Sequence, residues 1–143
     1  MNVTASWQFW AVMSAVFAAL TAIFAKVGVE AINSDLATFI RTVVVIVTLG
    51  FLLAVTGQFQ APGSISGRSY LFLVLSGLGT GASWLCYFRA LKIGEAAKVA
   101  PIDKLSVVLV AIFGVVFLGE KLTAPNWFGV ALVATGAVLI AYR

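Results

Sequence analysis

Histidine is absent from the 143-residue sequence, and Cys86 is its single cysteine. One cysteine cannot form an internal disulfide, and without histidine the common Cys/His metal sites cannot be built. We therefore expect no resident metal and no cofactor. Cys86 lies in an apolar run beside Trp84, and we expect it to be a small buried hydrophobic residue.

Charge is also scarce. Charged residues make up 10% of the chain and hydrophobic residues 62%, whereas a soluble domain carries roughly 25% charged residues. Too little polar surface is available to cover a water-soluble globule, so lipid is predicted to be the main solvent. The net charge of +4 fits basic residues at helix ends that face anionic headgroups. The sequence contains no basic stripe with interleaved aromatic residues, so nucleic acid is not expected as a partner.

Five long apolar segments are predicted to cross the membrane, because a spanning helix needs about 20 apolar residues. We predict an all-α integral membrane protein with five transmembrane helices, in one domain over residues 1–143. The polar cluster Asn33-Ser34-Asp35 is suited to capping the second helix. The predicted spans cover residues 7–25, 36–56, 70–91, 99–119 and 126–142.

Lysine and arginine are unevenly distributed between the two ends of these helices. One end carries only Arg68 and Lys121. Cytoplasmic loops are enriched in these residues, so we predict an external N-terminus and a cytoplasmic C-terminus in the bacterial inner membrane. The other end carries Lys26, Arg89, Lys92, Lys98 and Arg143, and Arg41 and Lys104 lie close enough to extend toward it.

Glycines mark surfaces at which membrane helices are expected to approach closely. Gly77 and Gly81 lie in the third span, where three glycines in five residues either pack within the chain or loosen a helix that lines a cavity. Gly129 and Gly136 share one face of the fifth span. This face either packs within the chain or joins two copies of it.

Ionisable residues inside a span are candidate functional residues, because their charge is costly there. Asp103 is the only carboxylate in a predicted span. Next to Pro101 it is expected in the first helical turn, as an interfacial cap or as a substrate or proton site at the cytoplasmic mouth of a cavity. Arg41 either anchors to phosphate or recognises a substrate carboxylate. The candidates for a substrate pathway are Asp103, Lys104, Arg41, Ser83 and Trp84.

Several stretches carry a family resemblance. They include Ala100-Pro101-Ile102-Asp103-Lys104-Leu105-Ser106, Leu118-Gly119-Glu120-Lys121-Leu122-Thr123 and the glycine-containing residues 129–136. Together they resemble the EamA-like domain of the drug/metabolite transporter superfamily, and residues 22–26 and 39–42 also fit. The resemblance implies half of a ten-helix fold, whose two domains are inverted, and transport of a small metabolite through a central site. The chain is similar to the five-helix bacterial and archaeal branch.

The chain departs from this pattern at two places. Four-helix relatives use a glutamate in the first helix to bind protons and drugs, but no ionisable residue lies between Trp7 and Ala25. Their multidrug mechanism is therefore not implied. Related domains often have proline after Leu-Ser in the fourth span. Here Val107 follows Ser106, so the resemblance does not support a proline kink there.

No nucleophile–base pair and no phosphate-binding loop is present, so we do not expect an enzyme. We expect a half-transporter subunit for a small-molecule substrate, surrounded by membrane lipid. It would act as a homo-oligomer, most simply a dimer, or with a paired half-subunit. The alternatives are an accessory or structural membrane subunit without its own pathway, and a passive channel.

Overall fold

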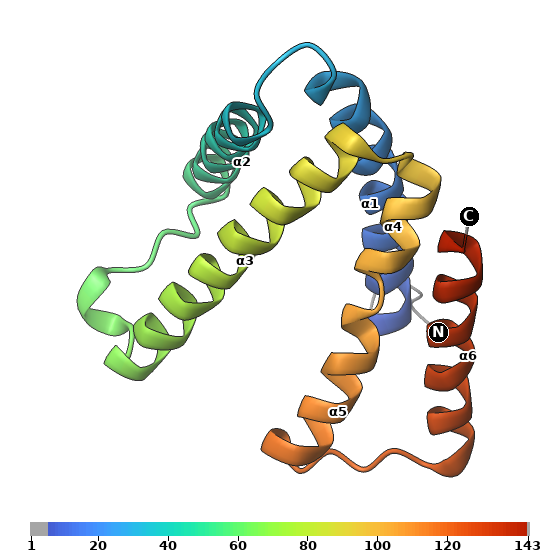
Figure 1. Ribbon diagram of the computed structural model, residues 1–143. Coiled ribbons are helices and arrows are strands. Elements are labelled where there is room, and N and C mark those ends of the chain that lie inside the picture. The colour runs from blue at the N-terminus through green and yellow to red at the C-terminus, as the bar shows by residue number, and fades with distance from the viewer. Residues whose placement is uncertain (1–5, 143) are drawn as a thin grey trace. The chain divides into compact units, whose positions relative to one another are not determined.

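The computed structural model describes residues 6–142, all of whose regular structure is helical. Five segments are long and apolar enough to cross a membrane, as predicted, and the fourth of them joins two shorter helices. Arg143, which entered the charge distribution above, lies outside the described residues. In chain order the elements are α1 (Trp7–Val29), α2 (Ser34–Thr56), the 3-10 helix η2 (Pro62–Ser64), α3 (Gly67–Ile93), α4 (Ala96–Asp103), α5 (Ser106–Leu118) and α6 (Ala124–Ala141) (Figure 1).

The chain divides into two compact units. One unit is Phe24–Lys92, which holds the end of α1, all of α2 and nearly all of α3. The other unit holds the rest of α1 together with α4, α5 and α6, and in it α6 packs against both α4 and α5.

Local sequence signals account for both ends of α2. The Asn33 side-chain oxygen accepts hydrogen bonds from the backbone N–H of Asp35 at 2.8 Å and of Leu36 at 3.2 Å. This confirms the predicted cap, which satisfies N–H groups that have no partner in the first turn. The helix ends at Gly57, whose φ of 64° lies in the left-handed region that glycine adopts without a Cβ penalty.

Glycines do not interrupt α3, which is continuous from Gly67 to Ile93. The glycines therefore do not break the helix, and the alternative that they line a cavity stays a prediction. In an apolar span the backbone groups have no partner outside the helix, so continuing the helix is favoured even where propensity is low. Within its own unit, a Cβ built on Gly77 or Gly81 would meet no atom within 4 Å. These glycines thus present an open helix face.

The fourth span is interrupted instead. The Lys104 N–H donates to the carbonyls of Ala100 and Pro101, and the Leu105 N–H donates to the carbonyl of Ile102 at 3.0 Å. The bonds from Lys104 to Pro101 and from Leu105 to Ile102 are of the tighter 3-10 type, and they carry the chain across the break between α4 and α5. Asp103 is therefore the last residue of α4. Its expected place in the first turn is wrong, because the helix starts at Ala96 and accommodates Pro101 internally.

Few side chains are buried. In each candidate span only 6–11% of the most apolar window is buried, and the two fully buried large side chains are Val29 and Leu91. Cys86 is exposed, which corrects the expectation of a buried cysteine. On a spanning helix an apolar side chain is stable facing lipid and needs no protein core. The chain is thus a multi-pass membrane protein with extensive apolar surface.

Candidate functional site

The interruption between α4 and α5 places a carboxylate inside a span. Asp103 is the eighth residue of α4, so it lies about 10 Å along the helix axis from Ala96. A carboxylate at a helix C-terminus faces the negative end of the helix dipole, which is unfavourable. Lys104 partly offsets this, because its Nζ donates to Asp103 Oδ2 at 3.2 Å. The role of an N-terminal cap is therefore excluded for Asp103.

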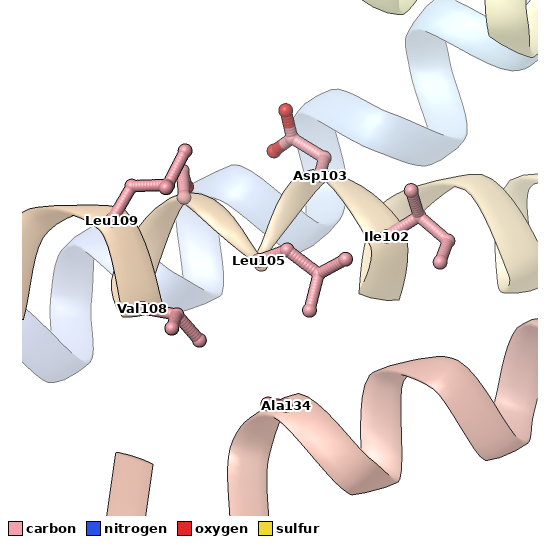
Figure 2. A pocket seen from close by; sticks show the side chains of 7 residues that line it. Ile102, Asp103, Leu105, Val108, Leu109 and Ala134 are labelled. Atoms are coloured by element: carbon pink, nitrogen blue, oxygen red, sulfur yellow. The ribbon is translucent and has the colours of Figure 1, made fainter. Parts of the chain in front are cut away.

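An open hollow of about 560 Å³ lies beside this interruption. In Figure 2 the Leu105 and Val108 side chains lie on the side facing α6 and Ala134, whereas the Asp103 carboxylate points away from α6. The hollow is thus mostly apolar, with a charged group at its edge. Its lining residues are Ile102, Asp103, Leu105, Ser106, Val108, Leu109 and Ala134.

In the other unit, Arg41 on α2 lies over the ring of Trp84 on α3. The guanidinium carbon is 3.8 Å from the centroid of Trp84 and 5.7 Å from that of Phe88. An arginine over an indole face gains a cation–π interaction, which is strongest where water is absent. Two of the predicted pathway residues are therefore brought together. Ser83 is exposed on α3 next to Trp84.

A polar junction joins the end of α1 and the start of α2 to the end of α3. Arg89 binds Asp35 through both carboxylate oxygens, with Nε to Oδ1 at 2.9 Å and a terminal nitrogen to Oδ2 at 2.8 Å. Lys26 Nζ donates to the Leu91 carbonyl at 2.8 Å, and Lys92 Nζ donates to the Ile32 carbonyl. We call these three contacts the α2–α3 junction. The sequence predicts only an orientation role for Arg89 and Lys92, because contacts 54 and 60 residues apart leave no local signal.

Comparison with known proteins defines the family. Residues 5–142, nearly the whole chain, match the EamA-like transporter family. The chain belongs to the EamA-like transporter family. The resemblance found in the sequence is thereby confirmed.

A relative of this EamA-like protein occurs in Sinorhizobium sp, where it is named an uncharacterized transporter in the cobO 3' region. It is 68% identical over 136 residues, which cover 95% of this chain and 96% of the relative. No solved structure matches the chain. The family and this relative together identify the EamA-like chain as a membrane transporter.

The contribution of the α2–α3 junction to stability can be tested at its ion pair. Asp35→Arg and Arg89→Asp should each lower the thermal unfolding midpoint of the purified protein, because each places two like charges together. The double exchange should recover most of the loss, since it restores the ion pair with reversed polarity. Circular dichroism in detergent measures the midpoint.

Arg68→Asp is the matched control, because it makes the same charge change at the other end of α3. It should shift the midpoint less than Arg89→Asp. If the midpoint of the double variant is only what the two single shifts add up to, the ion pair contributes nothing to stability.

Proposed function

We propose that this EamA-like protein is a half-transporter that moves a small metabolite across the bacterial inner membrane, as a dimer or with a paired half-subunit. The observation that carries the proposal is the carboxylate of Asp103 at an interruption inside a span, beside an open hollow. Interrupted helices at membrane depth are tolerated where they line a cavity, and in transporters they commonly form binding sites.

Asp103 is proposed to anchor a cationic group of the substrate. A carboxylate accepts charge-assisted hydrogen bonds from an ammonium, and the apolar lining of the hollow suits the rest of a small molecule. Lys104 is proposed to hold the carboxylate between transport cycles, as it does in the described structure. The substrate ammonium would then replace the lysine as the partner of Asp103.

Asp103→Asn tests this assignment. The amide keeps the shape of the carboxylate and removes its charge, so the initial rate of uptake should fall at least about tenfold, equivalent to about 1.4 kcal/mol. The measurement is uptake into proteoliposomes of whichever radiolabelled metabolite the unaltered protein is first found to transport.

Glu95→Gln provides the matched control, because Glu95 precedes the same helix and pairs with Lys98 at 3.3 Å. It should leave uptake nearly unchanged, and both variants must keep normal expression and size. Full uptake by Asp103→Asn would remove Asp103 from the mechanism. No flux of any solute through pure protein would favour an accessory subunit, and flux independent of an ion gradient would favour a channel.

The orientation is proposed to be N-terminus outside and C-terminus cytoplasmic. In the α2–α3 unit, the basic residues Lys26, Arg89 and Lys92 all take part in the junction, at the helix ends assigned to the cytoplasm. A cytoplasmic reporter fused to the C-terminus should be active and a periplasmic reporter inactive. Equal activity of the two reporters would establish mixed orientation.

The fifth span, α6, is proposed to join two copies. Gly129 and Gly136 are seven residues apart, and a Cβ built on either would meet no atom of its own unit within 4 Å. Helices approach closely at such surfaces. Gly129→Leu with Gly136→Leu should convert the dimer to a monomer by size in detergent and in bilayers.

Gly50→Leu, at a similarly open glycine on α2, is the control and should leave the dimer intact. An unchanged size for the double variant would exclude this interface. Inverted pairing of two identical chains conflicts with the strong charge bias. The dimer is therefore proposed to be parallel, unless an oppositely inserted partner chain supplies the second half.

A further inference from the structure

The guanidinium of Arg41 stays at the depth of its own backbone inside the α2 span. The Asp35–Arg89 ion pair joins the first turn of α2 to the last turns of α3. Six residues further into α2 lies Arg41, and six residues further into α3 lies Ser83, the neighbour of Trp84. The guanidinium lies over Trp84 at 3.8 Å and is farther from Phe88, which is one turn nearer the helix end. An arginine that reached toward the headgroups would lie on the Phe88 side.

Arg41 is also about 10 Å inside its helix, since it follows Ser34 by seven residues. Asp35–Arg89, Glu95–Lys98 and Asp103–Lys104 form ion pairs, and none of these three uses Arg41. A cation in a span is costly unless it is paired or faces an aqueous pathway. The structure therefore gives Arg41 a fixed position without a fixed counter-charge.

Trp84 covers one face of the Arg41 guanidinium, but its ring does not accept hydrogen bonds from the N–H groups at the edge of the guanidinium. A guanidinium carries five N–H donors in its plane, arranged to match the two oxygens of a carboxylate or phosphate. Arg89, on the same pair of helices, shows this bidentate geometry with Asp35. Arg41 has the donors and the aromatic support, and the partner that its chemistry requires is an oxyanion.

We propose that Arg41, held over Trp84, binds the carboxylate or phosphate group of the solute that the protein transports. The proposal rests on the proposed transport function and names an anionic group as part of its substrate class. An anionic lipid headgroup carries the same chemistry, but the depth of Arg41 favours a solute that enters a pathway. Trp84 acts as a positioning residue, because its ring restricts the guanidinium to one plane.

Equilibrium binding tests the site without requiring flux. Replacing Trp7, Trp10 and Trp127 by Phe leaves Trp84 as the sole tryptophan of the full-length chain. In maltoside detergent, sodium acetate and inorganic phosphate are titrated at constant ionic strength, with acetamide as the neutral match of acetate. Acetate or phosphate should change the Trp84 emission with saturation, and acetamide should not. Saturation by neither oxyanion, or equal saturation by acetamide, would overturn the proposal.

Variants of Arg41 test whether the change in Trp84 emission comes from binding at Arg41. Arg41→Gln should raise the midpoint of the titration at least tenfold, and Arg41→Lys should raise it less, because lysine keeps the charge but loses the bidentate fork. Arg68→Gln is the matched control, since Arg68 also lies over an aromatic ring, that of Phe72 at 5.8 Å, and it should not move the midpoint. Equal titration midpoints for the Arg41 variants and for the protein with Arg41 unaltered would overturn the proposal, even if oxyanions bind elsewhere.

Lipid is distinguished from solute in nanodiscs. A change of Trp84 emission with phosphatidylglycerol content, but none with acetate or phosphate, would make a headgroup the occupant and overturn the solute proposal. Saturation by acetate or phosphate in phosphatidylcholine nanodiscs supports it. Oxyanion binding in a protein that transports nothing would leave the Arg41 site in place and contradict the proposed function. Transport without oxyanion binding would contradict only the Arg41 site.

Discussion

In a bilayer every backbone N–H and C=O must find its partner within the protein, because lipid offers neither donors nor acceptors. This constraint explains why α3 stays helical through its glycines and why Asn33 caps α2 with two hydrogen bonds. The same constraint applies to the break between α4 and α5. There Lys104 and Leu105 leave the regular α-helical pattern but keep right-handed helical backbone angles, and the carbonyls of Ala100, Pro101 and Ile102 all accept hydrogen bonds. The break therefore places a carboxylate inside the span while these three carbonyls keep their partners.

The charged side chains near the spans differ in how they are compensated. Asp35 and Arg89 neutralise each other with two hydrogen bonds. Asp103 has only its sequence neighbour Lys104, at 3.2 Å. Arg41 has an aromatic face instead of a counter-ion. Because a charge in lipid is costly unless it is paired or hydrated, the last two groups are the ones whose compensation is proposed to change when a solute binds. Asp35 and Arg89 instead form a fixed connection.

Local and periodic features were predictable from the sequence. Apolar runs predicted the five spans, the Asn33 cluster predicted a cap, and the charge of Arg41 in an apolar segment marked it as a candidate. The position of the helix break was not predictable, because no glycine lies in residues 100–106 and no proline follows Ser106. The glycines of α3 suggested either close packing or a loosened helix, and α3 is continuous through them. The Asp35–Arg89 pair and the stacking of Arg41 on Trp84 depend on how α2 faces α3, and residues 54 and 43 positions apart give no sequence pattern for that.

Orientation and folding are coupled in this chain. Lys26, Arg89 and Lys92 contribute to the positive charge that is proposed to set orientation, and the same three side chains bond the Leu91 carbonyl, Asp35 and the Ile32 carbonyl. Removing these charges would be needed for insertion in both membrane orientations, but it would also remove the α2–α3 junction. Inverted pairing of identical copies would therefore require changes that weaken the fold. A partner chain with the opposite charge bias, or a parallel dimer, satisfies both constraints, because each leaves the junction of this chain intact.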